Sequence, residues 1–377
     1  MSAYQLYKET VSRDITDILK DMGCLPIVFL GAGMTRRYFG SPSWEQLLQQ
    51  ACEANPVLDK DYIYYRQAFD SLPKVAQAFV GPYHEWAWSK GKRRFPKGLF
   101  EKNVPKEAYL KYFVSKIIKD TQPNKISQIK PKGLRDEVKL LQEIRPSSII
   151  TTNYDQLAEF FYPDYTPIVG QTIIKTPSTM IGEIFKIHGC VTNTEEIVLT
   201  ESDYSNWNEK KKYLSAKLLT YFLEHPVIIL GYSAQDPNVL SILRDIDEIL
   251  ASHGEIVENL YYVIYDEKLS DSSSPPTEIL LDLGGGSSMR VKAIYTNDMS
   301  WVYQAFVANA GMENVNPKIL RALMSRTYDL VRHDIPTSTV EVDYSTLEQA
   351  VDKENFLPKL LGITSISEPE HFNAAYP

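Results

Sequence analysis

Short apolar runs alternate with longer segments of helical periodicity along most of this chain. The first run, at 27–30, is apolar on both faces, as in a central strand of a sheet that helices cover on both sides. Similar runs occur in the segments 148–155, 182–189, 226–233, 260–265 and 291–295. Helical patterns occupy 1–24, 44–54, 210–224 and 237–246. This alternation predicts an α/β fold with a Rossmann-like parallel sheet and helices on both faces.

Two regions depart from that alternation. Residues 57–145 hold no strand-like run, and their aromatic and basic residues are irregularly spaced, so we expect a helical insertion beside the sheet. The pattern predicts one domain over 1–300, which includes this insertion, and a C-terminal extension over 301–377. The extension contains a candidate edge strand at 340–344, and we expect it to serve assembly or partner contact.

The first strand is followed at once by two glycines, Gly31 and Gly33, which permit a tight turn and close approach to a flat or anionic ligand. We expect a short polar loop next, and then a helix that begins with a capping box of Ser43 and Gln46. A dinucleotide fingerprint would place a third small residue at Arg36. The glycines alone therefore leave two interpretations open, a nucleotide site and a purely structural turn.

Composition narrows the possible environments. The chain has 377 residues, of which 44% are hydrophobic and 23% charged, as in an ordinary globular protein. Three scattered cysteines without a Cys-x-x-Cys motif argue against a zinc ribbon, and we expect no metal. The absence of a 20-residue apolar run and of a signal-peptide profile predicts a cytoplasmic protein without membrane contact.

Charge argues against broad DNA binding. The net charge is −8, although residues 90–97 form a basic loop. A charge run of this kind is usually a solvated surface, so direct nucleic-acid contact is not expected.

Four of the predicted strands end in polar or glycine residues. These endings are Gly31 to Gly33, Asn153 to Asp155, His188 with Gly189, and Gly231 to Ser233. Each has a structural alternative: a turn, a helix cap or, for His188, a histidine packed in the core. Ligands of open α/β sheets bind at the carboxyl ends of the strands, so the convergence favours a site for a dinucleotide and a hydrolytic water.

Taken in order, these endings resemble the motifs of the sirtuin superfamily. The segments are Gly-Ala-Gly at 31–33, Thr-Asn-Tyr-Asp at 152–155, Lys-Ile-His-Gly at 186–189 and Gly-Tyr-Ser at 231–233. Pro-Ser-Trp at 42–44, Leu-Thr-Glu-Ser-Asp-Tyr at 199–204 and the continuation to Asp236 and Pro237 look like the sirtuin-like domains of bacterial antiphage defence proteins. The resemblance spans about residues 20–300, apart from most of the insertion.

This resemblance implies that NAD is the substrate. Asn153 would position the nicotinamide ribose and the attacking water, Asp155 would lie near the carboxamide, and His188 would act as general base. The unperturbed pKa of histidine, about 6.5, suits that last role. The remaining residues implied to bind NAD are Gly31, Ala32, Gly33 and Met34 after the first strand, with Thr152, Gly189, Gly231, Ser233 and Asp236.

The chain also departs from protein-deacylating sirtuins. It cannot build their four-cysteine zinc module, and it lacks the acidic-Phe-Arg stretch after the glycine loop. Both departures favour hydrolysis of NAD to nicotinamide and ADP-ribose, with antiphage defence by NAD depletion. A non-enzymatic NAD- or ADP-ribose-binding regulatory subunit, a protein deacylase and an ADP-ribosyl transferase remain alternatives.

The resemblance also bears on assembly. An unrestrained NAD hydrolase would poison its host, so we expect a homo-oligomer under the control of a partner. Stand-alone chains of this kind resemble the subunit that assembles with a hexameric HerA-type ATPase, which is therefore the expected partner.

Overall fold

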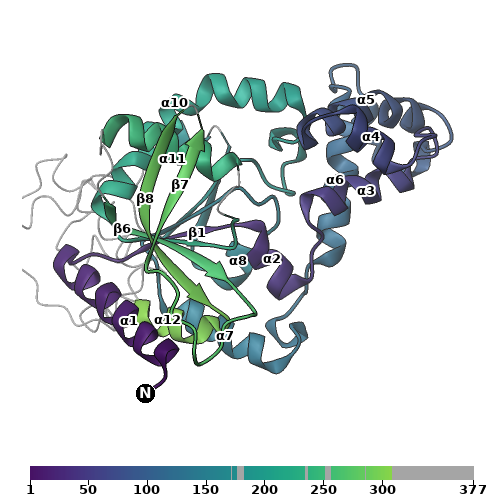
Figure 1. The fold of residues 1–377 in the computed structure, drawn as a ribbon. Helices are drawn as coiled ribbons and strands as arrows, with labels where there is room; N and C mark the ends of the chain where they lie inside the picture. Colours follow the sequence, from purple (N-terminus) through teal and green to yellow (C-terminus); the bar gives the residue numbers. More distant parts are fainter. Residues whose placement is uncertain (171, 176–181, 234–236, 251–255, 285, 308–377) are drawn as a thin grey trace, which may run out of the picture.

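The computed structural model describes residues 1–170, 172–175, 182–233, 237–250, 256–284 and 286–307. An eight-stranded sheet with the order β3-β4-β2-β1-β5-β6-β8-β7 forms its centre (Figure 1). All neighbouring strands are parallel except β7 and β8, which pair antiparallel. The strands are β1 (Ile27–Leu30), β2 (Ser148–Thr151), β3 (Thr166–Val169), β4 (Glu183–Lys186), β5 (Val227–Leu230), β6 (Ile256–Tyr265), β7 (Glu278–Gly284) and β8 (Ser287–Thr296). The predicted α/β fold is confirmed.

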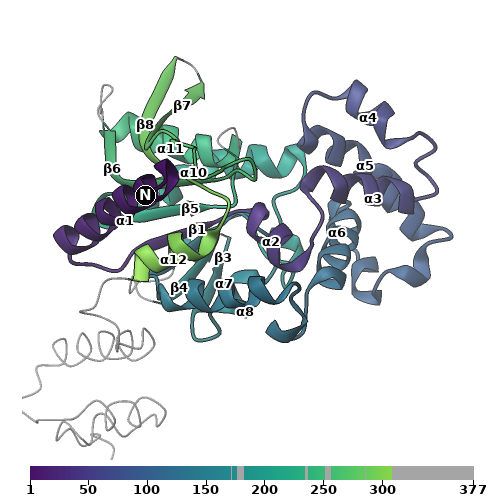
Figure 2. The same ribbon diagram turned by 60° about the horizontal axis from the view of Figure 1, so that its bottom comes forward.

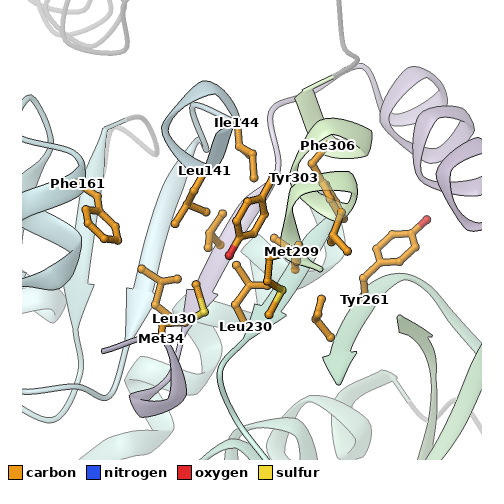
Figure 3. Close-up of a cluster of buried hydrophobic side chains, with 14 of the residues drawn as sticks. Leu30, Met34, Leu141, Ile144, Phe161, Leu230, Tyr261, Met299, Tyr303 and Phe306 are labelled. Atoms are coloured by element: carbon orange, nitrogen blue, oxygen red, sulfur yellow. The ribbon is translucent and has the colours of Figure 1, made fainter. Parts of the chain in front are cut away.

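One face of the sheet is covered by α1 (Ala3–Met22), α7 (Lys132–Glu143), α8 (Leu157–Phe161) and α12 (Met299–Val307). Alternate strand residues such as Val28 and Leu30 point into this layer, because successive side chains of a strand face opposite sides. Figure 3 shows Leu30 and Leu230 among side chains from α7 and α12, including Leu141 and Tyr303. In Figure 2, α1 and α12 lie side by side on this face.

The opposite face packs against α9 (Thr172–Lys175), α10 (Glu201–Glu224) and α11 (Pro237–Leu250). Phe29 of β1 and Phe185 of β4 are fully buried there. Strands β1 and β5 are buried on both sides, which is why the runs at 27–30 and 227–230 show no polar alternation.

A third group of helices packs around a core of its own. It comprises α3 (Trp44–Ala54), α4 (Tyr62–Ala68), α5 (Leu72–Trp88) and α6 (Glu107–Thr121), and we refer to it as the helical layer. Phe79 and Tyr83 are at its centre, and the layer extends to one side of the sheet (Figure 1). The next helix, α7, packs on the sheet instead. The predicted division at residue 300 falls within α12, and the candidate strand at 340–344 lies outside the described residues, so that division stays a prediction.

The structure corrects several local predictions. The segment after Gly31 is not a polar loop but the helix α2 (Ala32–Phe39). Met34 and Tyr38, one turn apart, are buried against the sheet, and this packing stabilises the helix. Helix α10 begins at Glu201, ahead of the predicted 210, behind a capping box of Thr200 and Asp203. Strands β3 and β7, at the two edges of the sheet, were not predicted. The capping box of Ser43 and Gln46 is confirmed.

Candidate active site

The segments that follow β1 and β5 meet at the carboxyl ends of these two neighbouring strands. The strand order of the sheet reverses between them, with β2 and β4 on one side and β6 and β8 on the other. The backbone N–H of Gly33 donates to the carbonyl of Gly231 at 2.8 Å. A Cβ on Gly31 would lie 2.6 Å from the same carbonyl oxygen, and Gly231 itself has a φ of +75°. These glycines therefore allow two backbones to approach closely, at the switch point where open α/β sheets bind ligands.

A cavity of about 130 Å³ opens beside these loops. Five residues implicated by the sequence contribute to its lining: Ala32, Thr152, Asn153, Asp155 and His188. They come from the ends of β1, β2 and β4, which are neighbours in the sheet. The three predicted catalytic residues, Asn153, Asp155 and His188, are thus brought together at one cavity.

Thr35 of α2 connects two of these side chains. Its hydroxyl donates to Asp155 Oδ2 at 2.8 Å and accepts a hydrogen bond from Asn153 Nδ2 at 3.1 Å. The second carboxylate oxygen, Asp155 Oδ1, accepts from the backbone N–H of Leu157 at the start of α8. Because the amide nitrogen of Asn153 is held by Thr35, its orientation in the cavity is fixed.

Two buried residues of the neighbouring strands, Thr151 and Lys186, hold the loop that carries Asn153 and Asp155. Thr151 Oγ1 accepts from the backbone N–H of Asn153 at 3.0 Å and donates to the carbonyl of Leu30 at 2.7 Å, which ties the ends of β1 and β2 together. The ammonium of Lys186, whose side chain is fully buried, donates to the carbonyl of Asp155 and pairs with Glu159 at 3.1 Å. A buried cation that is both paired and hydrogen-bonded holds the loop in one position.

His188 is buried, with 1% of its surface exposed. Its ring meets those of Tyr204 and Trp207 edge to face, with centroids 5.6 and 4.8 Å away. No described residue forms a hydrogen bond with Nε2. Burial lowers the pKa of His188 to about 3, so the imidazole is neutral at pH 7. The pKa thus departs from the near-neutral value of a free imidazole because desolvation disfavours the charged ring, and the role of His188 as a general base stays a prediction.

Residues 147–280, which run from β2 into β7, match the family model of the SIR2-like domain. The chain is 26% identical over 107 residues to "Defense-associated sirtuin 2" of Bacillus subtilis, which covers 27% of this chain and 11% of that protein. It is 24% identical over 126 residues to "NAD(+) hydrolase ThsA" of Cytobacillus dafuensis, which covers 32% of this chain and 26% of that protein. The matches therefore span a small part of either relative.

Of the other predicted binding residues, those that the structure describes do not line the cavity. Met34 is buried in the core of the first sheet face, beneath Gly231. Gly189, with a φ of +93°, packs against the backbone of Glu196, where a Cβ would clash. Ser233 is exposed, and its carbonyl accepts from Tyr262 Oη at 2.6 Å. Asp236 lies outside the described residues.

Several lining residues were not assigned a role from the sequence. They are Thr35, Ser41, Pro42, Trp44, Leu47, Ile118, Tyr154, Tyr204 and Tyr232. Tyr232 donates to the carbonyl of Leu30 at 2.9 Å and shares a hydrogen bond with the hydroxyl of Thr152 at 2.9 Å. Thr35 could have been found from the sequence, because a helix that starts at Ala32 places Thr35 one turn further on the same side.

Among the described residues, no group of three or more His, Cys, Asp or Glu side chains is arranged to hold a metal ion. None of their helices is both long enough and apolar enough to cross a bilayer.

Proposed function

We propose that this protein is an NAD glycohydrolase that cleaves NAD to nicotinamide and ADP-ribose. The observation that carries the proposal is the shared cavity of Asn153, Asp155 and His188, in which the buried Nε2 of His188 lacks a partner among the described residues. Unpaired polar atoms are uncommon in protein interiors, and a catalytic role, an ordered water or a bound ion can account for them.

The residue types suit this reaction. Water adds to the anomeric carbon of the nicotinamide ribose, the bond to the ring nitrogen breaks, and nicotinamide leaves as a neutral molecule, so it needs no acid. Asn153, fixed by Thr35, orients the ribose and the water. The neutral imidazole of His188 offers one ring nitrogen as an acceptor to a ribose hydroxyl or to the water. The carboxylate of Asp155 stabilises the positive charge that develops on the ribose.

The comparisons support the same reaction. One relative is named as an NAD(+) hydrolase and the other as a defence-associated sirtuin, and residues 147–280 of this chain match the model of the SIR2-like domain. We therefore propose that the reaction serves antiphage defence, by depleting NAD in the infected cell.

Product analysis tests the proposal. Purified protein is incubated with NAD, and nicotinamide and ADP-ribose are separated by chromatography. Asn153→Ala and His188→Ala should each abolish turnover, whereas His84→Ala, a histidine of α5 that packs against Tyr109 outside the cavity, should leave it unchanged. Intact NAD would reject the proposal, and NAD binding without turnover would favour the regulatory subunit. Conversion of acyl-lysine peptides would favour the deacylase.

We also propose that the protein forms a homo-oligomer controlled by a HerA-type ATPase. The support is the motif resemblance, together with the need to restrain an enzyme that would drain its host of NAD. Light scattering of the purified chain, alone and mixed with a HerA-type ATPase, measures assembly, and NAD turnover of the same samples measures control. A monomer that neither binds the ATPase nor changes its rate would contradict this proposal.

A further inference from the structure

The connection between α5 and α6 in the helical layer (Figure 1), residues 89–106, concentrates positive charge that the rest of the chain lacks. It contains seven Lys and Arg residues and one acidic residue, so it carries a net charge of +6, whereas the remaining chain carries −14. All seven are exposed, and none forms an ion pair with a described residue. We refer to these residues as the basic surface: Lys90, Lys92, Arg93, Arg94, Lys97, Lys102 and Lys106.

Buried aromatic residues hold this connection in one conformation. Phe95 is 6% exposed, and its ring meets those of Trp86 and Tyr109 edge to face, with both centroids 5.6 Å away. Gly91 packs so closely on the Trp86 indole that a Cβ would lie 2.7 Å from it. The guanidinium of Arg94 lies over the same indole, 5.3 Å from the ring centroid. An ordered loop therefore presents the cations of the basic surface.

A half-exposed tryptophan stands beside the basic surface. Trp88 is the last residue of α5 and is 52% exposed. Its indole N–H donates to Tyr109 Oη at 2.9 Å, and its ring meets Phe100 edge to face, with centroids 5.2 Å apart. The ammonium of Lys92 lies 5.9 Å from the centroid of the indole and 5.5 Å from that of Phe100. The indole is thus held in place, next to a cation, with about half of its surface in solvent.

We infer that this surface binds single-stranded nucleic acid: phosphates contact the basic surface, and a base stacks on Trp88. The sequence alone favours a solvated surface, because charge runs usually are one. The structure adds an ordered loop, cations without ion pairs and a fixed aromatic ring. A base inside a duplex is covered by its neighbours in the stack, and the carboxylates of an acidic protein segment would leave the ring unused. The inference goes beyond the proposed function, since no residue of 89–106 lines the cavity.

Fluorescence anisotropy of a labelled oligothymidylate of about 20 nucleotides, measured with the full chain and without NAD, tests the inference. Affinity should fall at least about tenfold between about 50 and about 200 mM salt, because each phosphate contact releases counterions. Arg93→Glu combined with Lys97→Glu should weaken binding at least about tenfold and flatten this salt dependence. Arg13→Glu combined with Lys20→Glu is the matched control. Both residues are exposed on α1, outside the helical layer, and the change in net charge is the same, so affinity should stay within about threefold.

Trp88→Leu separates stacking from charge. It keeps an apolar contact with Phe100 and removes the flat ring, so affinity should fall about tenfold while the salt dependence stays the same. Trp88→Phe keeps a ring and should bind within about threefold of the unsubstituted protein. Urea unfolding checks that each variant is folded.

Four results would overturn the inference. They are a failure to bind the oligonucleotide, equal losses in the two charge-reversal proteins, an affinity that Trp88→Leu leaves unchanged, and a duplex of the same length that binds as tightly as the single strand. Competition separates nucleic acid from an acidic protein partner. If polyglutamate displaces the labelled strand as effectively as unlabelled oligothymidylate does, the surface recognises charge alone and the inference is wrong.

Discussion

The hydroxyl of Thr35 should matter more for activity than its small size suggests. Thr35 is 3% exposed, and its Oγ1 lies between Asp155 Oδ2 and Asn153 Nδ2. Thr35→Val keeps the shape of the side chain and leaves both of these buried groups without a partner. An unpaired buried polar group costs about 1–3 kcal/mol, so we expect the free energy of unfolding to fall by about 2–4 kcal/mol. Once the amide of Asn153 can rotate, turnover should fall about a hundredfold.

Thr35→Ser is the matched control, because it keeps the hydroxyl and removes one methyl group. It should cost about 1 kcal/mol of stability and retain turnover within a few-fold. Urea unfolding measures the stability of both variants, and chromatography of NAD consumption measures their activity below the unfolding transition. If the valine variant works as well as the serine variant, the hydroxyl does not orient Asn153, and our reasoning about this network is wrong.

Three further predictions address the frame of the site. Gly231→Ala would place a Cβ 2.6 Å from a backbone nitrogen of α2, so the free energy of unfolding measured in urea should fall by at least about 3 kcal/mol. Gly133→Ala is the control: its Cβ would meet nothing within 4 Å, and the free energy of unfolding should rise by about 0.5–1 kcal/mol. The pKa of His188 is lower in the folded protein than in the unfolded chain, so its contribution to the free energy of unfolding is complete above pH 6.5 and is lost as pH falls. Between neutral pH and pH 5.5, the free energy of unfolding should fall by about 1 kcal/mol more in the unsubstituted protein than in His188→Gln. Equal losses in the two proteins would contradict this. Lys186→Met should lower the free energy of unfolding by about 3–5 kcal/mol, because it leaves Glu159 without its partner. Adding Glu159→Leu should restore much of this stability, as measured by thermal unfolding. A further loss of stability in the double variant would contradict the pairing.

The sheet could be predicted from the sequence because its inner strands are short, continuous apolar runs. The edge strands could not. Strand β3 contains Pro167, which weakens any strand pattern, and exposes Thr166. Strand β7 pairs with only one neighbour, and Leu280 in its middle is 67% exposed. Such residues follow neither the alternation of a half-buried strand nor the uniform apolarity of a central one.

The site was predicted in part for a similar reason. Polar strand ends identified Asn153, Asp155 and His188, because topology brings the carboxyl ends of neighbouring parallel strands together. Thr35 was missed because its segment was taken for a loop, although the i, i+4 pair of Met34 and Tyr38 indicates a helix. The low pKa of His188 depends on aromatic neighbours from α10, and no local pattern reveals such a distant contact.

The cavity lies between the sheet and the helical layer, which have separate hydrophobic cores. The groups proposed to carry out the reaction stand on the sheet, whereas Trp44 and Leu47 stand on the helical layer, whose core is distinct. Substitutions in that layer can therefore change which ligands the cavity accepts without disturbing the framework that holds the groups proposed to react. Variation among related chains should accordingly alter ligand preference through α3 and α6 long before it alters the reaction.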